Sequence, residues 1–365
     1  MSAAAEPSRP RLAVLFGGRS SEHAISCVSA GSVLDALADG PWELIPIGIT
    51  REGTWVLPEA DQGFSIDGAA LPEVLHGRPV VLVGNGEFRG YRPLDGGEPV
   101  ALDVVFPVLH GPYGEDGTVQ GLLEMAGLPY VGSGVFASAA AMDKAHMKAM
   151  LQVAGLPQAP YAVLVGDDDL TEADRERLGL PVFVKPARGG SSVGISKVSA
   201  WDKLPAALAL ARESDPKLVI EAGVVGREVE CGVLGQGGAA ATEVPEASLP
   251  AEIHVSPDFD FYDFEAKYLS DSTTFDVPAE LPPEVTEQVR RVAVQAFSAL
   301  DCAGLARVDF FVTADGGIVL NEVNTMPGFT PVSMYPRMWA ATGVEYPKLV
   351  RRLVELAVER GSALS

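Results

Sequence analysis

Charged and amide side chains alternate with apolar residues in one C-terminal stretch, where residue types and spacing point most directly to chemistry. Asp315-Gly316 predicts the two-residue turn of a β-hairpin. With that turn, Asp309 pairs with Glu322 and Arg307 pairs with Asn324. Because strand side chains alternate between faces, all four lie on one face of the hairpin.

This face predicts a metal site. Two opposed carboxylates repel each other, and a divalent cation relieves that repulsion. The oxygen-only set Asp309, Glu322 and Asn324 suits Mg²⁺, which prefers a few carboxylates together with substrate phosphates. Two alternatives stay open: an ordinary exposed polar face, or a three-residue turn that shifts the register and separates the acids. The Pro327-Gly328 turn that follows favours a site, since its backbone N–H groups could face a developing oxyanion.

A lysine at a strand end, Lys185, precedes a loop rich in glycine and serine at 189–194. Backbone N–H groups of such a loop can wrap phosphates. The loop matches neither the P-loop pattern nor the dinucleotide-binding Gly-x-Gly-x-x-Gly pattern, which disfavours the two commonest nucleotide folds. Taken alone, the loop is equally consistent with a mobile hairpin tip.

Three isolated carboxylates and one histidine are further candidates for binding a nucleotide or a substrate. Glu221 and Glu228 could accept hydrogen bonds from an adenine amino group and a ribose hydroxyl, although surface solvation explains either one equally well. Glu22 could hold a substrate ammonium, although stabilisation of a helix N-terminus is the more common role for a carboxylate there. His110 ends a strand, where a histidine is more often satisfied locally.

The N-terminal elements that carry these residues alternate between strand and helix. Apolar runs predict strands at 12–16, 104–109 and 128–131, and helical spacing predicts helices at 25–37 and 119–126. This order predicts a mostly parallel sheet. The stretch 50–99 is rich in glycine and proline and is expected to be an irregular insertion.

The region from Met142 to Glu221 is expected to be an antiparallel α+β unit, with strands at 182–185, 195–198 and 218–221 and helices at 144–154 and 204–212. The third region is expected to hold a strand at 229–234, a pair of strands within 306–323, and helices at 283–300 and 344–359. The segment 254–278 is bracketed by proline and has no regular pattern. A run of this length is uncommon in a compact domain unless it is functional.

Composition limits the partners. The 365 residues carry a formal net charge of −22, which disfavours nucleic acid and anionic membranes. The N-terminus lacks the blocks of a signal peptide and no apolar run is long enough to span a membrane, so we expect a cytoplasmic protein. The three cysteines are few and far apart, and we expect them to be buried rather than paired or metal-bound.

Eight motifs occur in one consistent order along the chain: Gly17-Gly-Arg-Ser-Ser-Glu22-His-Ala-Ile-Ser26, Leu109-His-Gly-Pro-Tyr-Gly-Glu115-Asp-Gly-Thr-Val-Gln120, Met142-Asp-Lys144, Phe183-Val-Lys185-Pro, Gly190-Ser191-Ser-Val-Gly194, Glu265-Ala-Lys267-Tyr268, Arg307-Val-Asp309 and Asn321-Glu322-Val-Asn324-Thr-Met-Pro-Gly328. Through these motifs the chain resembles the D-alanine:D-alanine ligase family of the ATP-grasp superfamily, from near residue 12 to the C-terminal helix. One departure is Ala222, where the family often has lysine.

The resemblance implies an α/β (α+β) fold of three domains with ATP between the central and C-terminal ones. The implied boundaries are 1–133, 134–221 and 222–365, with a lid at about 254–278 in the third domain. A soluble homodimer acting on D-alanine and ATP is implied as well.

The resemblance also implies roles for individual residues. The implied ATP-binding residues are Lys144, Lys185, Ser191, Glu221, Glu228, Lys267, Asn321 and Glu322. Two Mg²⁺ ions, for which Mn²⁺ can substitute, are expected on Asp309, Glu322 and Asn324. The implied substrate-binding residues are Glu22, His110, Arg307, Gly328, Ser333 and Met334, and the implied catalytic residues are Glu22, Ser191, Tyr268, Arg307 and Gly328.

The implied reaction transfers the γ-phosphoryl group to the carboxylate of a first D-alanine, and the amine of a second D-alanine then attacks the acyl phosphate. Tyr268 favours the dipeptide product, since ligases that make D-alanyl-D-lactate typically replace it with phenylalanine or reorganise the lid. A ligase for D-lactate or D-serine on the same scaffold is the alternative. A non-catalytic nucleotide sensor and a nicotinamide-dependent oxidoreductase are more remote, because the site residues are complete and the dinucleotide motif is missing.

Overall fold

The computed structural model describes residues 9–59, 64, 71–84, 86–190, 193–237, 243–254 and 274–362. The chain divides into two compact units. The first comprises residues up to Val135 together with Met326–Pro336 and the segment from Val344 onward, and the second comprises Phe136–Thr325 with Arg337–Gly343. The three-domain division at residues 133 and 221 stays a prediction.

A seven-stranded mixed sheet forms the centre of the first unit, with strand order β6-β5-β4-β3-β2-β1-β7. Its strands are β1 (Arg11–Gly17), β2 (Glu43–Ile49), β3 (Trp55–Pro58), β4 (Gly77–Gly84), β5 (Arg89–Pro93), β6 (Val100–Ala101) and β7 (Val104–Pro107). β1 is parallel to both β2 and β7, and the remaining neighbours are antiparallel.

The prediction of a mostly parallel sheet is therefore wrong, and so is the prediction of an irregular insertion at 50–99. That stretch supplies β3, β4 and β5, which extend the sheet beyond β2. These strands were hard to recognise because β4 has several exposed residues and its flanks are rich in glycine and proline. The predicted strand at 128–131 is reduced to a single parallel bridge between Val105 and Tyr130.

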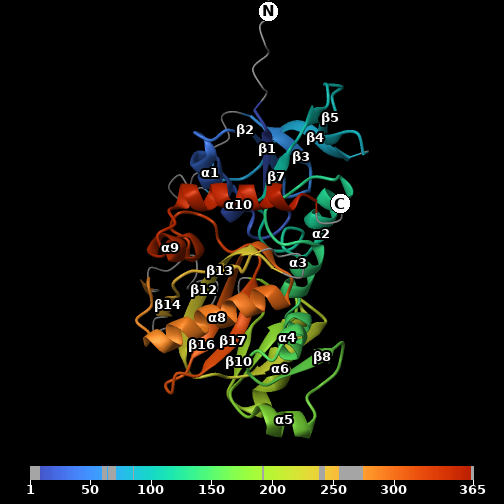
Figure 1. Cartoon of the computed structure of the whole chain (residues 1–365). Helices are drawn as coiled ribbons and strands as arrows, with labels where there is room; N and C mark the ends of the chain where they lie inside the picture. Colours follow the sequence, from blue (N-terminus) through green and yellow to red (C-terminus); the bar gives the residue numbers. More distant parts are fainter. Residues whose placement is uncertain are drawn as a thin grey trace, which may run out of the picture. The chain divides into compact units, whose positions relative to one another are not determined.

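The helices of the first unit are α1 (His23–Leu37), α2 (Thr118–Met125) and α10 (Tyr346–Arg360). Leu12–Phe16 are buried because β1 is a central strand between two parallel neighbours, a position that favours a continuous apolar run. The predicted helices at 25–37, 119–126 and 344–359 are confirmed. α10 contacts α1 and β7 (Figure 1), so the C-terminal helix belongs to the first compact unit.

The second unit contains a four-stranded antiparallel sheet of order β10-β9-β11-β8. Its strands are β8 (Tyr161–Val165), β9 (Val182–Pro186), β10 (Ser196–Val198) and β11 (Lys217–Ala222). The helices of this part are α3 (Val135–Met142), α4 (Lys144–Val153), α5 (Glu172–Leu178), the 3₁₀ turn η1 (Trp201–Lys203) and α6 (Leu204–Arg212). The predicted antiparallel arrangement is confirmed, whereas α3, α5 and β8 were not anticipated.

A six-stranded sheet completes the second unit, in the order β15-β14-β12-β16-β17 with β13 paired to β12. Its strands are β12 (Arg227–Gln236), β13 (Glu246–Ala247), β14 (Ala251–His254), β15 (Thr274–Asp276), β16 (Ala303–Val312) and β17 (Ile318–Asn324). Helix α8 (Pro283–Ala299) lies along this sheet in Figure 1. A further helix, α9 (Met334–Ala341), was not predicted and spans the point where the chain passes between the units.

One face of the six-stranded sheet is a hydrophobic core and the other carries polar residues. Val229, Cys231, Val308 and Phe310 pack with α8 in one buried cluster. The alternate residues of β12 and β16 therefore point away from α8. The predicted site residues of these two strands belong to that second set.

Among the described residues, no helix is both long enough and apolar enough to cross a membrane. All three cysteines are buried, as predicted. Burial raises the pKa of Cys27 and of Cys231 to about 12, so these thiols are not poised for nucleophilic or metal chemistry.

Candidate active site

The hairpin of β16 and β17 has the predicted pairs and an unpredicted turn. Asp309 pairs with Glu322 and Arg307 with Asn324, as predicted. The prediction of a two-residue turn, however, is wrong. The N–H of Thr313 donates to the Gly317 carbonyl, so three residues form the loop, and Gly316 closes it with a φ of +83°.

A β-bulge reconciles these two findings. The register shifts by one between Asp309 and Phe310, which leaves Asn321 without a cross-strand partner residue in β16. The extra residue in the loop shifts the strand register by one residue. The bulge reverses that shift, so Asp309 still pairs with Glu322. The prediction of opposed carboxylates thus holds although its turn does not.

The bulge also determines which side chains share a face. Ile318, Leu320 and Val323 are in the core cluster with α8, so the alternation changes phase at the bulge. Asn321 and Glu322 are consecutive, yet both are partly exposed rather than part of that core. One strand thereby presents an amide and a carboxylate side by side.

Arg307 lies within a set of carboxylates on this face. Its Nε and Nη2 donate to Oδ1 and Oδ2 of Asp309, both at 2.7 Å, and its Nε lies 3.2 Å from Glu230 Oε1. Asn324 Nδ2 donates to Asp309 Oδ2 at 3.0 Å. Burial alone would lower the pKa of Arg307, but Asp309 and Glu230 hold it well above its usual range. The guanidinium is therefore a fixed positive charge.

The predicted lysines contact the same strand β17. Lys144 Nζ donates to the Gly189 carbonyl at 2.7 Å and lies 3.9 Å from Glu322 Oε2. Lys185 Nζ donates to Asn321 Oδ1 at 3.3 Å and to Glu221 Oε2 at 3.2 Å. The second unit thus brings together both predicted phosphate-binding lysines, Glu221, and the bulged strand that carries the predicted metal ligands.

Two buried charged residues of this region were missed from the sequence. Glu230 follows Glu228 by two positions on β12, a spacing that could have placed it on the same face. Lys148 follows Lys144 by four positions on α4, a spacing that could have placed it on the same helix face. Both were overlooked because charged residues in an element usually indicate solvent exposure.

The predicted metal ligands have the chemistry that a divalent ion requires. Asp309, Glu322 and Asn324 offer oxygen ligands, as Mg²⁺ and similar hard cations prefer. Each of the two carboxylates has a cationic side chain nearby, since Arg307 donates to Asp309 and Lys144 Nζ lies 3.9 Å from Glu322 Oε2. These residues fit a divalent metal.

In the first unit, Glu22 and His110 lie close together. Glu22 precedes α1 and makes no capping hydrogen bond with its side chain, so the carboxylate is not used to cap the helix. A Cβ atom on Gly111 would come within 2.8 Å of Glu22 Oε2, which places that carboxylate against the loop just after His110. The Glu22 charge also acts electrostatically on the imidazole.

His110 is buried and its hydrogen bonds define its protonation state. Nδ1 donates to the Met326 carbonyl at 3.1 Å, and Nε2 lies 3.4 Å from Ser29 Oγ. Burial lowers the pKa of His110, although Glu22 and the Met326 carbonyl oppose that shift. The imidazole is therefore neutral, with its proton on Nδ1.

The turn after β17 positions the remaining predicted groups of the first unit. A Cβ atom on Gly328 would lie 3.2 Å from Ser333 Oγ, so these two residues are neighbours. Ser333 Oγ accepts a hydrogen bond from the Thr330 N–H at 3.1 Å. Met334 is buried at the first position of α9. Gly328 and Ser333 therefore form one compact turn.

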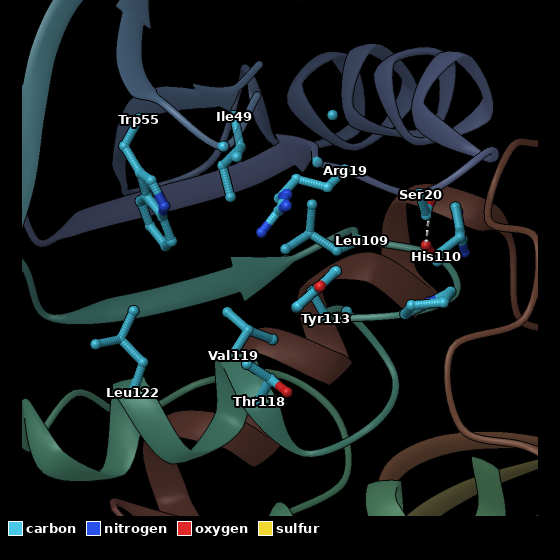
Figure 2. Close-up of a pocket in the computed structure, with 15 residues that line it drawn as sticks. Arg19, Ser20, Ile49, Trp55, Leu109, His110, Tyr113, Thr118, Val119 and Leu122 are labelled. Carbon is cyan, nitrogen blue, oxygen red and sulfur yellow. Dashed lines mark hydrogen bonds between the residues drawn. The ribbon is translucent and has the colours of Figure 1, made fainter. Parts of the chain in front are cut away.

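A cavity of about 330 Å³ lies in the first unit (Figure 2). Ser20 and His110 line it, and Ser20 Oγ donates to the His110 carbonyl at 2.7 Å. The Arg19 guanidinium lies over the Tyr113 ring, 5.0 Å from its centre. The other side chains labelled in Figure 2 are mostly apolar, including Trp55, so the cavity favours apolar rather than charged groups.

Three predicted site residues, Ser191, Lys267 and Tyr268, lie outside the described residues, as does most of the predicted lid at 254–278. At the two ends of the predicted lid segment, Glu252, His254 and Asp276 could together offer metal ligands. Arg227 already forms a two-pronged ion pair with Glu252, so this cluster is explained without a metal.

Comparison with known proteins places the chain in one family. A family model described as "D-ala D-ala ligase N-terminus" matches residues 11–133, and one described as "D-ala D-ala ligase C-terminus" matches residues 150–355. A D-alanine--D-alanine ligase from Frankia casuarinae is 59% identical and covers 98% of both chains. One from Nocardia farcinica is 56% identical over 98% of this chain and 99% of its own.

Solved structures agree. The D-alanine-D-alanine ligase from Coxiella burnetii is 34% identical with a TM-score of 0.82, covering 98% of this chain and 96% of its own. The VanG D-Ala:D-Ser ligase from Enterococcus faecalis is 35% identical with a TM-score of 0.83, covering 96% of this chain and 100% of its own. These relatives are ATP-grasp enzymes, which confirms the predicted fold class. The chain belongs to the D-alanine–D-alanine ligase family.

Proposed function

We propose that this protein joins two molecules of D-alanine at the expense of ATP, giving D-alanyl-D-alanine, ADP and phosphate for peptidoglycan synthesis. The observation that carries the proposal is the polar face of the second unit, where Asp309 and Glu322 oppose each other beside Arg307 and two lysines. Ligases of this family use ATP and a divalent metal ion and act on small molecules.

The ATP-binding part of the proposal lies in the second unit. Lys144 and Lys185 would bind phosphate groups, and Glu221 would accept a hydrogen bond from the adenine amino group. Glu228 would bind the ribose, with Ser191, Lys267 and Asn321 completing the set. Two Mg²⁺ ions, replaceable by Mn²⁺, would neutralise charge on the transferring phosphoryl group from Asp309, Glu322 and Asn324.

Charge balance supports this arrangement. In the structure Arg307 neutralises Asp309, and Lys144 lies near Glu322. Asp309 and Glu322 would hold the metal when it is bound, and the charges of Arg307 and Lys144 would then be balanced by anionic substrate groups. Arg307, which stays charged, is then available to hold the oxyanion of a tetrahedral intermediate.

The D-alanine part of the proposal lies in the first unit. Glu22 would bind the ammonium of the first D-alanine, and His110 would lie near its carboxylate. Being neutral, His110 can accept or donate a hydrogen bond without adding a charge. The Gly328 N–H would share the oxyanion with Arg307, and the Ser333–Met334 segment would bind the second D-alanine.

The order of events follows from the chemistry. Phosphoryl transfer to the first carboxylate makes its oxygen a competent leaving group, and the amine of the second D-alanine then displaces phosphate. Because an acyl phosphate hydrolyses, water must be excluded, and we assign that role to the 254–278 lid carrying Lys267 and Tyr268. Tyr268 would hold the lid closed through Ser191 and Glu22.

A second candidate product has a specific basis, since one solved relative is a D-Ala:D-Ser ligase. The catalytic groups proposed here serve either second substrate, so D-serine or D-lactate would change only the second subsite. Tyr268 and the identities of the curated relatives favour the dipeptide. A homodimer in the cytoplasm also remains part of the proposal.

The test is ADP release by the purified protein with MgATP and D-alanine, with products identified by mass spectrometry. Parallel reactions contain L-alanine, D-alanine with D-lactate, or D-alanine with D-serine. D-alanyl-D-alanine formed from the D-isomer alone supports the proposal. If ADP release requires D-lactate or D-serine, the protein is a ligase for that second substrate, and the proposed dipeptide product is wrong.

A further inference from the structure

Lys148 is a buried lysine to which the proposed function gives no role. Its side chain on α4 is 1% exposed, and its Nζ lies 3.3 Å from Glu221 Oε1 and 5.6 Å from the centre of the Tyr161 ring. The contact with Glu221 is an ion pair rather than a well-directed hydrogen bond. Lysine is rarely enclosed unless it is paired, because desolvating its charge is costly.

Glu221 holds one lysine on each carboxylate oxygen. Lys148 contacts Oε1, and Lys185 contacts Oε2 at 3.2 Å. The two lysines differ in their freedom, because Lys185 is 13% exposed and shares its ammonium with Asn321 Oδ1. Lys185 can therefore turn toward another anion, whereas Lys148 has no room to leave.

The backbone of α4 fixes Lys148 in place. Asp143 caps the helix by accepting from the N–H groups of Ala145 and His146, and Gln158 Nε2 donates to the Lys148 carbonyl at 3.0 Å. Lys144, one turn earlier, reaches the Gly189 carbonyl and approaches Glu322. One helix thus presents one lysine to the loop and bulged strand and a second to the buried carboxylate.

We propose that Lys148 is a positioning residue that remains on Glu221 as its permanent counter-ion, so that Lys185 can leave Glu221 for a nucleotide phosphate while Glu221 binds the base. This inference rests on the proposed assignment of Glu221 and Lys185 to ATP. Without Lys148, Glu221 would retain Lys185 as its single cation among these groups. The Glu221 carboxylate and the nucleotide phosphates would then compete for Lys185.

The charge state of Glu221 agrees with this role, and the Glu221 charge also opposes the lowering of the Lys148 pKa that burial causes. Burial alone would raise the pKa of Glu221, but the charges of Lys185 and Lys148 lower it below its usual value. An ionised carboxylate accepts hydrogen bonds and donates none. It therefore pairs with the amino group at position 6 of adenine and repels the carbonyl oxygen that guanine has there. Lys148 should consequently support selection of ATP over GTP.

The experiment replaces Lys148 by methionine, which is unbranched, is one atom shorter than lysine and has no charge. We expect the dissociation constant for ADP, measured by calorimetry without D-alanine, to rise about tenfold, because a contact involving a charged group is lost. The preference for ATP over GTP in turnover should fall. The KM for D-alanine should stay within about twofold of the wild-type value, well below the tenfold change expected for ADP.

The matched control is Lys217→Met. Lys217 lies on the same strand as Glu221 and forms an ion pair with Asp143 at the start of α4, so it links the same helix and strand. We expect this variant to lose thermal stability without changing ADP affinity or base preference. If Lys148→Met behaves like the control, Lys148 is merely structural and the inference is overturned.

Glu221→Gln separates failure of this inference from failure of the proposed site. If Glu221→Gln leaves ADP affinity unchanged, the assignment of Glu221 to ATP is wrong, and the inference fails with it. If Glu221→Gln weakens ADP and Lys148→Met does not, the inference alone is overturned. In the double variant, we expect Lys148→Met to add little to the loss of ADP affinity that Glu221→Gln causes alone. The double variant should also have a higher melting temperature than Glu221→Gln, because in Glu221→Gln the buried Lys148 ammonium lacks its carboxylate.

Discussion

At the scale of residues, the candidate site consists of charges that are already balanced before any substrate is considered. Arg307 is held between Asp309 and Glu230, and Glu221 between two lysines. Such pairs keep each group in a fixed charge state inside the protein. The sequence predicted Arg307 and Asp309 from strand alternation, but it could not show that Glu230 and Lys148 are buried, because burial of a charge depends on partners distant in sequence.

Glu322 provides the direct test of the metal assignment. We expect Glu322→Gln to reduce ADP formation about 100-fold or more, because the substitution removes an anionic ligand. The fold should persist, since the Glu322 side chain is partly exposed. Turnover and melting temperature are measured across a series of Mg²⁺ concentrations. The control is Glu246→Gln, an exposed carboxylate on the same sheet, and near-normal turnover of Glu322→Gln would remove Glu322 from the metal site.

His110 predicts a pH dependence of stability. Burial lowers the pKa of His110 below its ordinary value of 6.5, so the unfolded chain binds a proton more readily than the folded protein. The neutral imidazole therefore contributes full stability above pH 6.5, and this contribution declines as pH falls from 6.5 toward the lowered pKa. The stability difference between wild type and His110→Gln, measured by urea unfolding, should narrow between pH 7 and pH 5. A constant difference would show that His110 does not titrate in this window.

At the scale of elements, the β16–β17 hairpin shows what the sequence could and could not supply. The alternation of apolar and polar residues identified both strands and the face that carries the acids. The turn was misjudged because Asp315-Gly316 fits a two-residue turn, whereas Gly316 closes a three-residue loop. No residue type near Asn321 predicts the bulge from the sequence. Similarly, β3, β4 and β5 were missed because β3 and β5 are short and β4 has several exposed residues.

Deletion of Asn321 tests the function of the bulge. Removing this residue leaves Asp309 opposite Glu322 and keeps the apolar alternation of Leu320 and Val323, so the hairpin should still fold. Lys185 would lose its amide contact, and we expect the KM for ATP to rise about tenfold as a hydrogen bond to a charged group is lost. Asn321→Ala, which keeps the bulge, is the control for the side chain alone. An unchanged KM in both variants would exclude Asn321 from nucleotide binding.

At the scale of the whole molecule, the chain returns to its first compact unit at its end. Sequence order suggested that the C-terminal helix belongs to the third predicted segment, yet α10 packs with α1 and β7. Arg360 completes this packing by donating to the carbonyls of Tyr130 and Gly132, both at 2.7 Å, with its guanidinium over the Tyr130 ring. Helical periodicity predicted the helix but contains no information on which sheet it covers.

Leu353 tests whether α10 stabilises the first unit. Its side chain is fully buried in the helix face formed with Leu349, Val350 and Val354, so Leu353→Ala should lower the free energy of unfolding by about 2–5 kcal/mol. Hydrogen exchange should accelerate in α1 and β7, which contact α10, more than in α8 and β16, because the two compact units have separate cores. The control is Val358→Ala on the exposed side of the same helix, for which we expect little change. Equal acceleration of exchange in both units would mean that they unfold as one cooperative body, and α10 would then stabilise the whole protein rather than its first unit.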